Sequence, residues 1–334
     1  MIYNYGAHWN APIQREVNFA TTTMKHVAID DLKDLYVPPR GSHKGQNGRL
    51  LVIGGSHLFH AASLWALTVA SRIVDLVHYS SVPENNEIVQ KAKEEFRNGI
   101  VVPREDIENY IKEDDVILIG PGMVRAEESK VPGLAARAGK SIGEIGDIRE
   151  IGEIRDEGEQ TAALTNYLLA KYPQKQWVID AGALQMMDIT LIPKNAILTP
   201  HQGEFEILKS KVESRKSIKS LEIAGVEDQV KLFAKEYQCI VLLKGAQDIA
   251  SNGEEVRIIE GGNAGMTKGG TGDVLVGLIA ALVCKNDPFP ATIAGSFINK
   301  MAGEALYKKV GPYFHASDLA NEIPVTMKTL LISS

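Results

Sequence analysis

The chain has 334 residues, of which 44% are hydrophobic and 23% are charged, and its net charge is −6. This composition is typical of a globular protein in water, and the acidic balance argues against a general binder of nucleic acid or of membrane surfaces. No apolar run approaches the roughly 20 residues of a membrane-spanning helix. Residues 1–23 lack the order of a signal peptide, and Cys239 and Cys284 lie in apolar surroundings that favour reduced thiols, so we expect a cytoplasmic protein.

The first elements predict the start of an α/β unit. Residues 1–26 are expected to form a polar extension, and residues 27–35 a short acidic helix that two prolines end. An apolar strand at residues 49–53 then leads through Gly54-Gly-Ser56 into an alanine- and leucine-rich helix at residues 61–77. His57 and His60 lie three residues apart near this helix, but no third metal ligand accompanies them, and we expect no metal site there.

The remaining strands and helices alternate to the end of the chain. Further strands with their turns are expected at residues 78–82, 100–102, 115–122, 176–182, 196–204 and 239–248, followed by a hairpin of residues 249–253 and 256–260. Further helices are expected at residues 87–98, 106–112, 161–171, 217–237, 274–283, 290–310 and 316–330. This alternation predicts one α/β domain over residues 27–334, with three α/β/α layers and a mostly parallel central sheet.

Residues 133–160 depart from this pattern. Isoleucine recurs at every third position from 142 to 154, with glycine and charged residues between. A period of three matches neither a strand nor a long helical stripe. We therefore expect a mobile insertion in the form of a surface loop or a marginal helix.

The stretch from Gly261 to Val283 indicates an anion site. Its first half is rich in glycine, and its second half is apolar and long enough for about three helical turns. The amides of Gly269, Gly270, Thr271 and Gly272 are expected at the positive end of that helix, where they would form an anion hole for phosphate. Asp273 would repel such an anion, which is explained if its carboxylate accepts a proton from a group that attacks the phosphate. The alternative is an ordinary helix cap.

Glycine and polar residues also follow several expected strands. Because the carboxyl ends of parallel strands lie along one edge of a sheet, these residues are expected to share one cleft with the loop before Asp273. Taken singly, each of these segments is an ordinary turn. The segments are Gly54-Gly-Ser56, Gly120-Pro-Gly122, Asp180-Ala-Gly182, Thr199-Pro-His-Gln-Gly-Glu204 and Lys244-Gly-Ala-Gln-Asp248.

Together these motifs resemble the ADP- or ATP-dependent NAD(P)H-hydrate dehydratases, a family of the ribokinase-like superfamily. The resemblance runs from about Leu32 to Leu330 and is carried most specifically by Thr199-Pro-His-Gln-Gly-Glu204 and Asn263-Ala-Gly-Met-Thr-Lys-Gly-Gly-Thr-Gly-Asp273. Many members also carry an epimerase domain, for which the segment before Leu32 is too short. The resemblance implies a ribokinase-like fold and a hydro-lyase of the cytoplasm.

The implied activity is a repair reaction on hydrated NADH and NADPH. ADP or ATP would phosphorylate the ring hydroxyl, Asp273 would accept its proton, and phosphate would then leave. By the family pattern the substrate dinucleotide would contact Ala62, Gly122, His201 and Asp273. The nucleotide would contact Lys244, Gly245, Ala246, Gln247, Asp248 and Gly272. Mg²⁺ would bridge the phosphates, with Glu204 near it but without a direct bond, and the protein would form a homo-oligomer without nucleic-acid or membrane partners.

Two positions depart from the family pattern. Ala61 stands where glycine is common, and its methyl group could narrow the substrate pocket. Lys268 stands where a small or uncharged residue is usual, and its ammonium either adds phosphate affinity or points to solvent. Neither position indicates whether ADP or ATP is preferred.

Two other functions remain open on the sequence. A small-molecule kinase of the same fold, acting on a hydroxymethylpyrimidine, a hydroxyethylthiazole or a sugar, would share the Asp273 loop and release a stable phosphate ester. A non-catalytic nucleotide-binding module is the second alternative. His201 within its motif favours the dehydratase over the kinase, and a carboxylate facing phosphates argues against a mere binder.

Overall fold

A ten-stranded sheet forms the centre of the protein in the computed structural model, which describes residues 24–92, 98–125, 147–213 and 225–332. The strand order is β1-β10-β9-β8-β7-β6-β5-β2-β3-β4. Within these residues β9 is antiparallel to both neighbours, and every other pair is parallel. The strands are β1 (Met24–His26), β2 (Arg49–Ile53), β3 (Leu76–Ser80), β4 (Ile100–Val101), β5 (Val116–Ile119), β6 (Gln176–Ile179), β7 (Ile197–Leu198), β8 (Ile240–Leu243), β9 (Asp248–Ser251) and β10 (Val256–Ile259).

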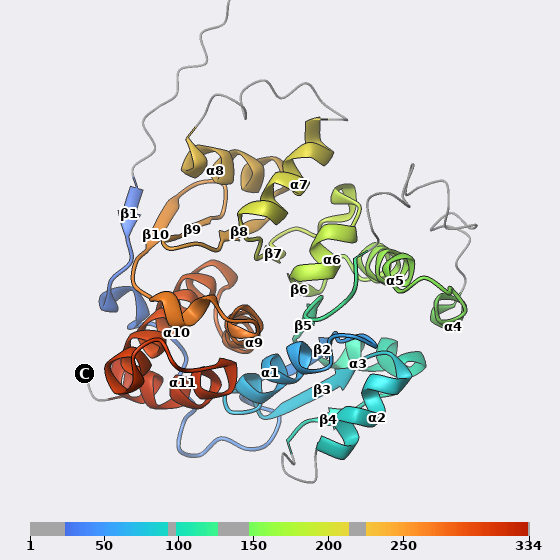
Figure 1. Cartoon of the computed structure of the whole chain (residues 1–334), viewed down its shortest axis with the longest axis horizontal. Coiled ribbons are helices and arrows are strands. Elements are labelled where there is room, and N and C mark those ends of the chain that lie inside the picture. The colour runs from blue at the N-terminus through green and yellow to red at the C-terminus, as the bar shows by residue number, and fades with distance from the viewer. Residues whose placement is uncertain (1–23, 93–97, 126–146, 214–224, 333–334) are drawn as a thin grey trace, which may run out of the picture.

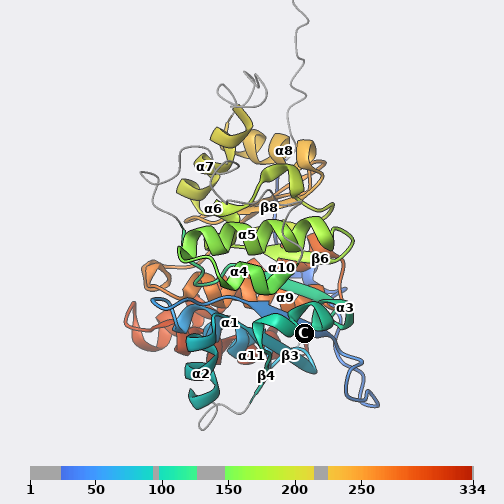
Figure 2. The ribbon, with the colours of Figure 1, turned by 90° about the vertical axis from the view of Figure 1, so that its right-hand side faces the viewer.

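Helices cover both faces of this sheet (Figures 1 and 2). One face packs against α1 (Ala61–Ala70), α9 (Thr271–Val283), α10 (Pro288–Val310) and α11 (Ala316–Leu331). The other packs against α3 (Ile107–Glu113), α4 (Ile148–Gly152), α5 (Glu157–Lys171), α6 (Ala181–Met186), α7 (Gln202–Glu213) and α8 (Val226–Tyr237). Helix α2 (Pro83–Ala92) follows β3. Alternate residues of one strand reach the two cores, as Leu50 and Leu51 do. The predicted three-layer fold with a mostly parallel sheet is therefore confirmed.

Several predicted boundaries change. The helix expected over residues 61–77 ends at Ala70, because Leu76 already begins β3 and the preceding turn is held by Asp75, whose carboxylate accepts three hydrogen bonds from Gly45 and Asn47. The helix expected over residues 27–35 is only a 3-10 turn, η1 (Ile29–Leu32). Other 3-10 turns are η2 (Arg104–Asp106), η5 (Ile189–Leu191) and η6 (Ala264–Thr267). Helices α6 and α7 replace what the sequence indicated as polar turns after two strands.

The expected N-terminal extension over residues 1–26 is wrong at its carboxyl end. Strand β1 pairs in parallel with β10, with Met24 opposite Val256 and His26 opposite Ile258. All three residues of β1 are exposed, so no alternation of apolar and polar residues marks this edge strand in the sequence. Residues 1–23 lie outside the described part of the chain.

Of the two forms expected for the insertion over residues 133–160, a surface loop or a marginal helix, the part that the structure describes agrees with the helix. From residue 147 onward the segment enters the fold as α4 and the start of α5, with Asp147 and Asp156 as their side-chain N-caps. Ile148 and Ile151 share one helix face at a spacing of three and are buried in the core beside α5. Ile148 and Ile151 thus mark the buried face of a short helix; residues 126–146 lie outside the described part of the chain.

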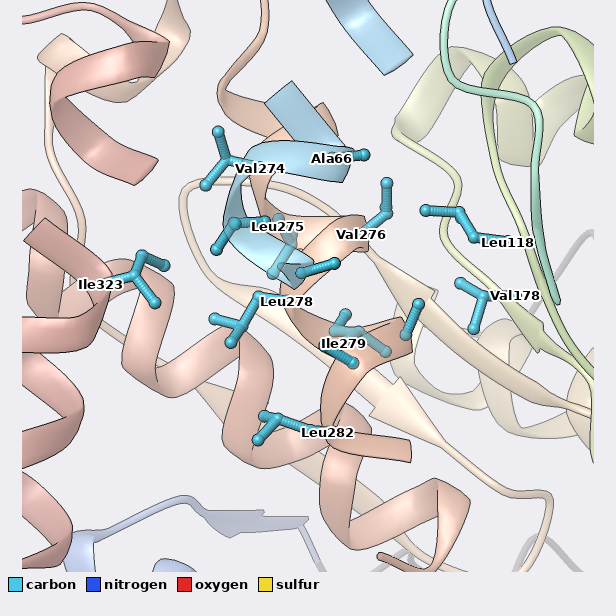
Figure 3. Close-up of a cluster of buried hydrophobic side chains, with 14 of the residues drawn as sticks. Ala66, Leu118, Val178, Val274, Leu275, Val276, Leu278, Ile279, Leu282 and Ile323 are labelled. Carbon is cyan, nitrogen blue, oxygen red and sulfur yellow. The ribbon is translucent and has the colours of Figure 1, made fainter. Parts of the chain in front are cut away.

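Helix α9 is the most enclosed helix of the first face, and all its residues after Asp273 are buried. Figure 3 shows its side chains between Leu118 and Val178 of the sheet and Ile323 of α11. A helix that is apolar all round is typical of a core position. Because its N-terminus is the end of the glycine loop, the packing of α9 fixes where that loop lies. No helix in the described ranges is long and apolar enough to cross a membrane.

The contact between α9 and α1 gives a test of this packing. A Cβ atom on Gly277 would lie 2.6 Å from the Ala66 backbone, so Gly277→Ala must push the helices apart. We expect this variant to lose about 1–3 kcal/mol of stability, measured as a lower thermal unfolding midpoint.

The control for this test is Gly152→Ala. A Cβ atom on Gly152, the last residue of α4, would meet nothing within 4 Å. We expect this variant to unfold at or slightly above the wild-type midpoint, because alanine is the better helix former. Equal midpoints for the two variants would contradict close packing of α1 on α9.

Candidate active site

The glycine loop enters α9 through a residue that must be glycine. Gly270 is the N-cap of α9 and has φ of 94°, a conformation that side chains disfavour. A Cβ atom there would lie 2.3 Å from the Trp65 ring and 2.7 Å from the Ala316 Cβ. The hydroxyl of Thr271 braces the loop, at 2.6 Å from the Met266 carbonyl and 2.9 Å from the Lys268 carbonyl. The loop is therefore fixed by close packing at Gly270 and by the hydrogen bonds of Thr271.

Three of the four amides predicted to bind phosphate are available. The backbone N–H of Thr271 donates to the Lys268 carbonyl oxygen at 3.3 Å. The amides of Gly269, Gly270 and Gly272 have no hydrogen-bond partner within the described residues. A helix N-terminus with unpartnered N–H groups attracts anions. The expected anion hole therefore has three free amides and not four, because the N–H of Thr271 is used in the turn.

Two cavities lie on either side of this loop. The first, of about 720 Å³, is lined by residues that include Phe59, His60, Ala61, Ala62, Trp65, Gly122, Met123, Arg125, Gln185, Gly269, Gly270 and Asp273. The second, of about 610 Å³, is lined by residues that include Lys244, Gly245, Ala246, Asp248, Thr271, Gly272, Leu275, Asn299 and Lys300. Successive residues of one loop thus face two different cavities, which is the arrangement that transfer of a group between two ligands requires.

Asp273 lies on the wall of the first cavity and is half-buried. Burial raises the pKa of its carboxyl, and the negative charge of Asp180 raises it further. The positive charge of Lys244 acts against both, and the pKa settles at about 7. A general base works best when its pKa is near the operating pH, so this carboxyl is suited to accept a proton. The alternative of an ordinary cap is not supported, because its side chain faces a cavity.

The turn that contains His201 and the turn that begins at Lys244 are adjacent, as predicted. Residues 201 and 244 form a parallel bridge, and the Lys244 N–H donates to the Pro200 carbonyl oxygen at 2.8 Å. The Lys244 ammonium donates to Asp180 Oδ1 at 2.7 Å. Burial opposes the charge of Lys244, but Asp180, Glu204 and Asp273 outweigh burial and raise its pKa. Lys244 is therefore an ion-paired cation whose side chain is only 19% exposed.

Asp180 is a central residue to which the sequence assigned no role. Its Oδ1 atom accepts from the Thr199 hydroxyl at 2.7 Å as well as from Lys244, and its side chain is buried. The signal was its place directly after β6, in one of the glycine-containing strand ends. Glu204 is also buried and is held by the His201 backbone N–H at 2.9 Å and by Gln185 Nε2 at 3.0 Å.

The other predicted contact residues divide between the cavities, with two exceptions. His201 does not line either cavity, and its ring is 60% exposed. Gln247 is exposed and donates to Glu260 at 3.0 Å. The first cavity contains the predicted Ala62, Gly122 and Asp273. The second contains the predicted Lys244, Gly245, Ala246, Asp248 and Gly272.

Asp248 lines the second cavity and fixes the backbone beside it. Its carboxylate accepts from the Gly245 N–H at 2.9 Å and from the Ser296 hydroxyl at 2.7 Å. The ammonium of Lys300 lies 3.3 Å from the same carboxylate and donates to the carbonyl oxygens of residues 245, 246 and 261. Lys300 lies inside the long helix α10, where no motif in the sequence marks it as a site residue.

The two departures from the family pattern have different outcomes. Ala61 is one of the residues that line the first cavity. Lys268 is exposed and lines neither cavity. Its ammonium donates to the Pro312 carbonyl and lies 5.4 Å from the centre of the Phe314 ring. The alternative in which Lys268 adds phosphate affinity is therefore not supported.

Comparison with known proteins relates this geometry to one family. The family model described as NAD(P)H-hydrate dehydratase matches residues 147–325. The chain is 36% identical over 298 residues to the ADP-dependent (S)-NAD(P)H-hydrate dehydratase of Nitrosopumilus maritimus, covering 88% of this chain and 93% of that one. It is 34% identical over 304 residues to the bifunctional NAD(P)H-hydrate repair enzyme of Methanocaldococcus jannaschii, covering 90% of this chain but 52% of that one. The chain thus spans about half the length of the bifunctional relatives.

Solved structures agree on the fold. The ADP/ATP-dependent NAD(P)H-hydrate dehydratase of Bacillus subtilis superposes with a TM-score of 0.66 at 21% identity, covering 93% of this chain and 99% of that one. A ribokinase-like superfamily protein of Enterococcus faecalis gives 0.68 at 22% identity, covering 97% and 99%. The predicted ribokinase-like fold is confirmed.

The raised pKa of Asp273 has a consequence for stability. The folded protein holds a proton that the unfolded chain releases between pH 3.8 and about 7. The protonated Asp273 carboxyl therefore makes its full contribution to the free energy of unfolding below pH 3.8, and this contribution is lost as the pH rises to about 7. We expect Asp273→Asn, which stays uncharged, to have a thermal unfolding midpoint that exceeds wild type by a growing margin from pH 4 to 7 and a constant margin above.

The control for this measurement is Asp34→Asn, at an exposed turn. Its difference from wild type is expected to stay small across the same pH range. An Asp273→Asn margin that is equal at pH 4 and pH 8 would show that the carboxyl is not perturbed.

Proposed function

The chain belongs to the NAD(P)H-hydrate dehydratase family, and on that premise we propose that it restores hydrated NADH and NADPH to the active coenzymes at the expense of ADP or ATP. The observation that carries this proposal is the position of Asp273, a carboxyl with a pKa of about 7 in the first turn of α9, directly after the glycine loop that separates two cavities. The first cavity would hold the hydrated nicotinamide ring, and the second would hold the nucleotide.

The first chemical step is phosphoryl transfer to the ring hydroxyl. Hydroxide is a poor leaving group, so the hydroxyl must be converted to a phosphate ester before it departs. Asp273 accepts the hydroxyl proton as the oxygen attacks the terminal phosphorus of the nucleotide. The amides of Gly269, Gly270 and Gly272 stabilise the charge on the transferred group, because N–H groups fixed at a helix start need no reorganisation. Loss of phosphate, assisted by the lone pair of the ring nitrogen, and loss of a proton from the neighbouring ring carbon then regenerate the dihydronicotinamide.

The contacts to the two ligands are proposed from the same geometry. Lys244 and the backbone of residues 245 and 246 border the nucleotide cavity, where a partly buried cation favours phosphate. Ala62 and Gly122 border the substrate cavity. His201 and Gln247 lie outside both cavities, and we propose that they contact the parts of the ligands that extend beyond them. Asp248 acts by holding the loop at residue 245.

The charges near the nucleotide cavity suit a Mg²⁺ ion that arrives with the phosphates. Within the described residues no cluster of three or more His, Cys, Asp or Glu side chains is arranged to hold a metal. Asp180 and Glu204 are nonetheless close enough to Lys244 to shift its pKa, and one or two carboxylates with water are typical for this ion. We propose that these two residues face the ion through water. When bound, it would neutralise phosphate charge.

We also propose that the enzyme works in the cytoplasm, as a homo-oligomer. The described residues form one domain, which begins with β1 at Met24. Cys239 and Cys284 are free thiols, consistent with the cytoplasm. The resemblance to the family supports a homo-oligomer.

One assay tests the proposed reaction. The protein is incubated with hydrated NADH, Mg²⁺ and either ADP or ATP, and the absorbance of the dihydronicotinamide is followed. We expect recovery that depends on a nucleotide. Failure to recover NADH with either nucleotide would refute the proposal, and a stable phosphate ester as the only product would indicate a kinase.

The role of Asp273 is tested by Asp273→Asn. We expect kcat to fall by about 10²–10⁴-fold, the usual contribution of a positioned base, while nucleotide binding measured by calorimetry stays close to wild type. The wild-type kcat/KM is expected to rise with pH to a plateau, with a midpoint near pH 7, because only the ionised carboxylate accepts a proton. Asp34→Asn should match wild type. Retention of wild-type kcat by Asp273→Asn would exclude the base role.

A further inference from the structure

The proposed reaction requires a second proton acceptor. Water adds to an enamine such as the dihydronicotinamide with its hydroxyl on the carbon next to nitrogen and its hydrogen on the neighbouring carbon. Restoring the double bond therefore removes two protons, one from oxygen before phosphorylation and one from carbon afterwards. Asp273 holds the first of these protons when the second must leave. The following inference rests on the proposed function.

Few groups in the substrate cavity can accept that second proton. Among its described lining residues only His60, Arg125 and Asp273 are titratable. The guanidinium of Arg125 is a hydrogen-bond donor without an acceptor atom, and it donates to Gln185 Oε1 at 3.2 Å. Asp273 is protonated at this stage of the reaction. His60 is therefore the remaining base on the cavity wall.

The structure fixes which nitrogen of His60 is free. His60 is the residue directly before α1. Its Nδ1 lies 3.0 Å from Asn85 Oδ1. The amide group of Asn85 donates both hydrogens, to the Tyr79 hydroxyl at 2.7 Å and the Ser81 hydroxyl at 2.9 Å. Asn85 Oδ1 is thus an acceptor, and Nδ1 of His60 carries the proton.

The buried position of Asn85 makes this tautomer firm. Asn85 and Ser63 are completely buried, and the Ser63 hydroxyl lies 2.8 Å from that of Tyr79, so the chain of hydrogen bonds is anchored in the core. The second ring nitrogen, Nε2, has no hydrogen-bond partner within the described residues. In the neutral ring Nε2 therefore has a free lone pair, on a side chain that lines the cavity.

We propose that Nε2 of His60 is the base that removes the ring proton in the elimination step. The carbon–oxygen bond of the phosphate ester breaks, its electron pair leaves with phosphate, and the nitrogen lone pair forms a carbon–nitrogen double bond. His60 then takes the proton from the neighbouring carbon. The electrons of that carbon–hydrogen bond form the ring double bond, and nitrogen regains its lone pair. The products are the dihydronicotinamide, phosphate and a protonated imidazole.

His60→Asn separates the two steps. The asparagine amide nitrogen can replace Nδ1 as the donor to Asn85 but offers no group in place of Nε2. In single turnovers with ATP and hydrated NADH, we expect ADP to form within a few-fold of the wild-type rate. Recovery of absorbance should slow by at least about 100-fold, so that ADP forms well before NADH is restored. His43→Asn, at an exposed loop, is the matched control and should match wild type in both measurements.

Two further measurements make the result independent of folding defects. Free imidazole should restore recovery in His60→Ala, where the ring has left a space. His60→Gln, which also lacks a base, should show the same split between ADP formation and recovery. Recovery close to wild type in His60→Asn, or equal loss of both steps in all three variants, would overturn the inference. If the wild-type protein itself restores no NADH, the proposed function fails instead.

Discussion

The site depends on a helix start that tolerates no side chain. Gly270 has a positive φ and is wedged between the ring of Trp65 and Ala316, so α1, α9 and α11 meet at its Cα atom. Behind it α9 is buried on all sides, and in front of it the chain separates two cavities. The position of Asp273 is thus set by packing over the whole first face of the sheet. A reactive group placed in this way needs no movement of its own helix to meet both ligands.

The charges at the strand ends explain why the pKa of the Asp273 carboxyl lies close to neutral pH. Lys244 is ion-paired with Asp180 at 2.7 Å, so much of its attraction is directed away from Asp273. Asp273 therefore experiences burial and a second carboxylate, with only partial relief from Lys244. This arrangement costs stability, because it keeps two acidic groups, Asp180 and Asp273, beside one partly buried cation, Lys244. The same cost gives a base whose proton affinity suits neutral pH.

Much of the fold could be predicted from sequence, because most strands are short apolar runs, several with glycine in the turn that follows, and α9 is a continuous apolar helix. The edge strand β1 could not be predicted, since its three residues are all exposed and only Met24 is apolar. The helix that contains Ile148 and Ile151 was expected only as one of two forms, because five residues are too few to show a helical stripe. The glycine loop, Lys244 and Asp273 were identifiable as motifs. Lys300 and the role of Asp180 were not, because they depend on contacts between distant segments.

The central claim is that the oxygen leaving the damaged ring departs on a phosphoryl group. It is tested most directly by preparing hydrated NADH in ¹⁸O-labelled water, so that its ring hydroxyl carries the label, and allowing the enzyme to restore it with ATP in ordinary water. Mass spectrometry of the phosphate should find one labelled oxygen per molecule, in proportion to the label measured in unreacted hydrate. Unlabelled phosphate alongside full recovery of NADH would contradict the account, because the hydroxyl would then have left as water without receiving the phosphoryl group.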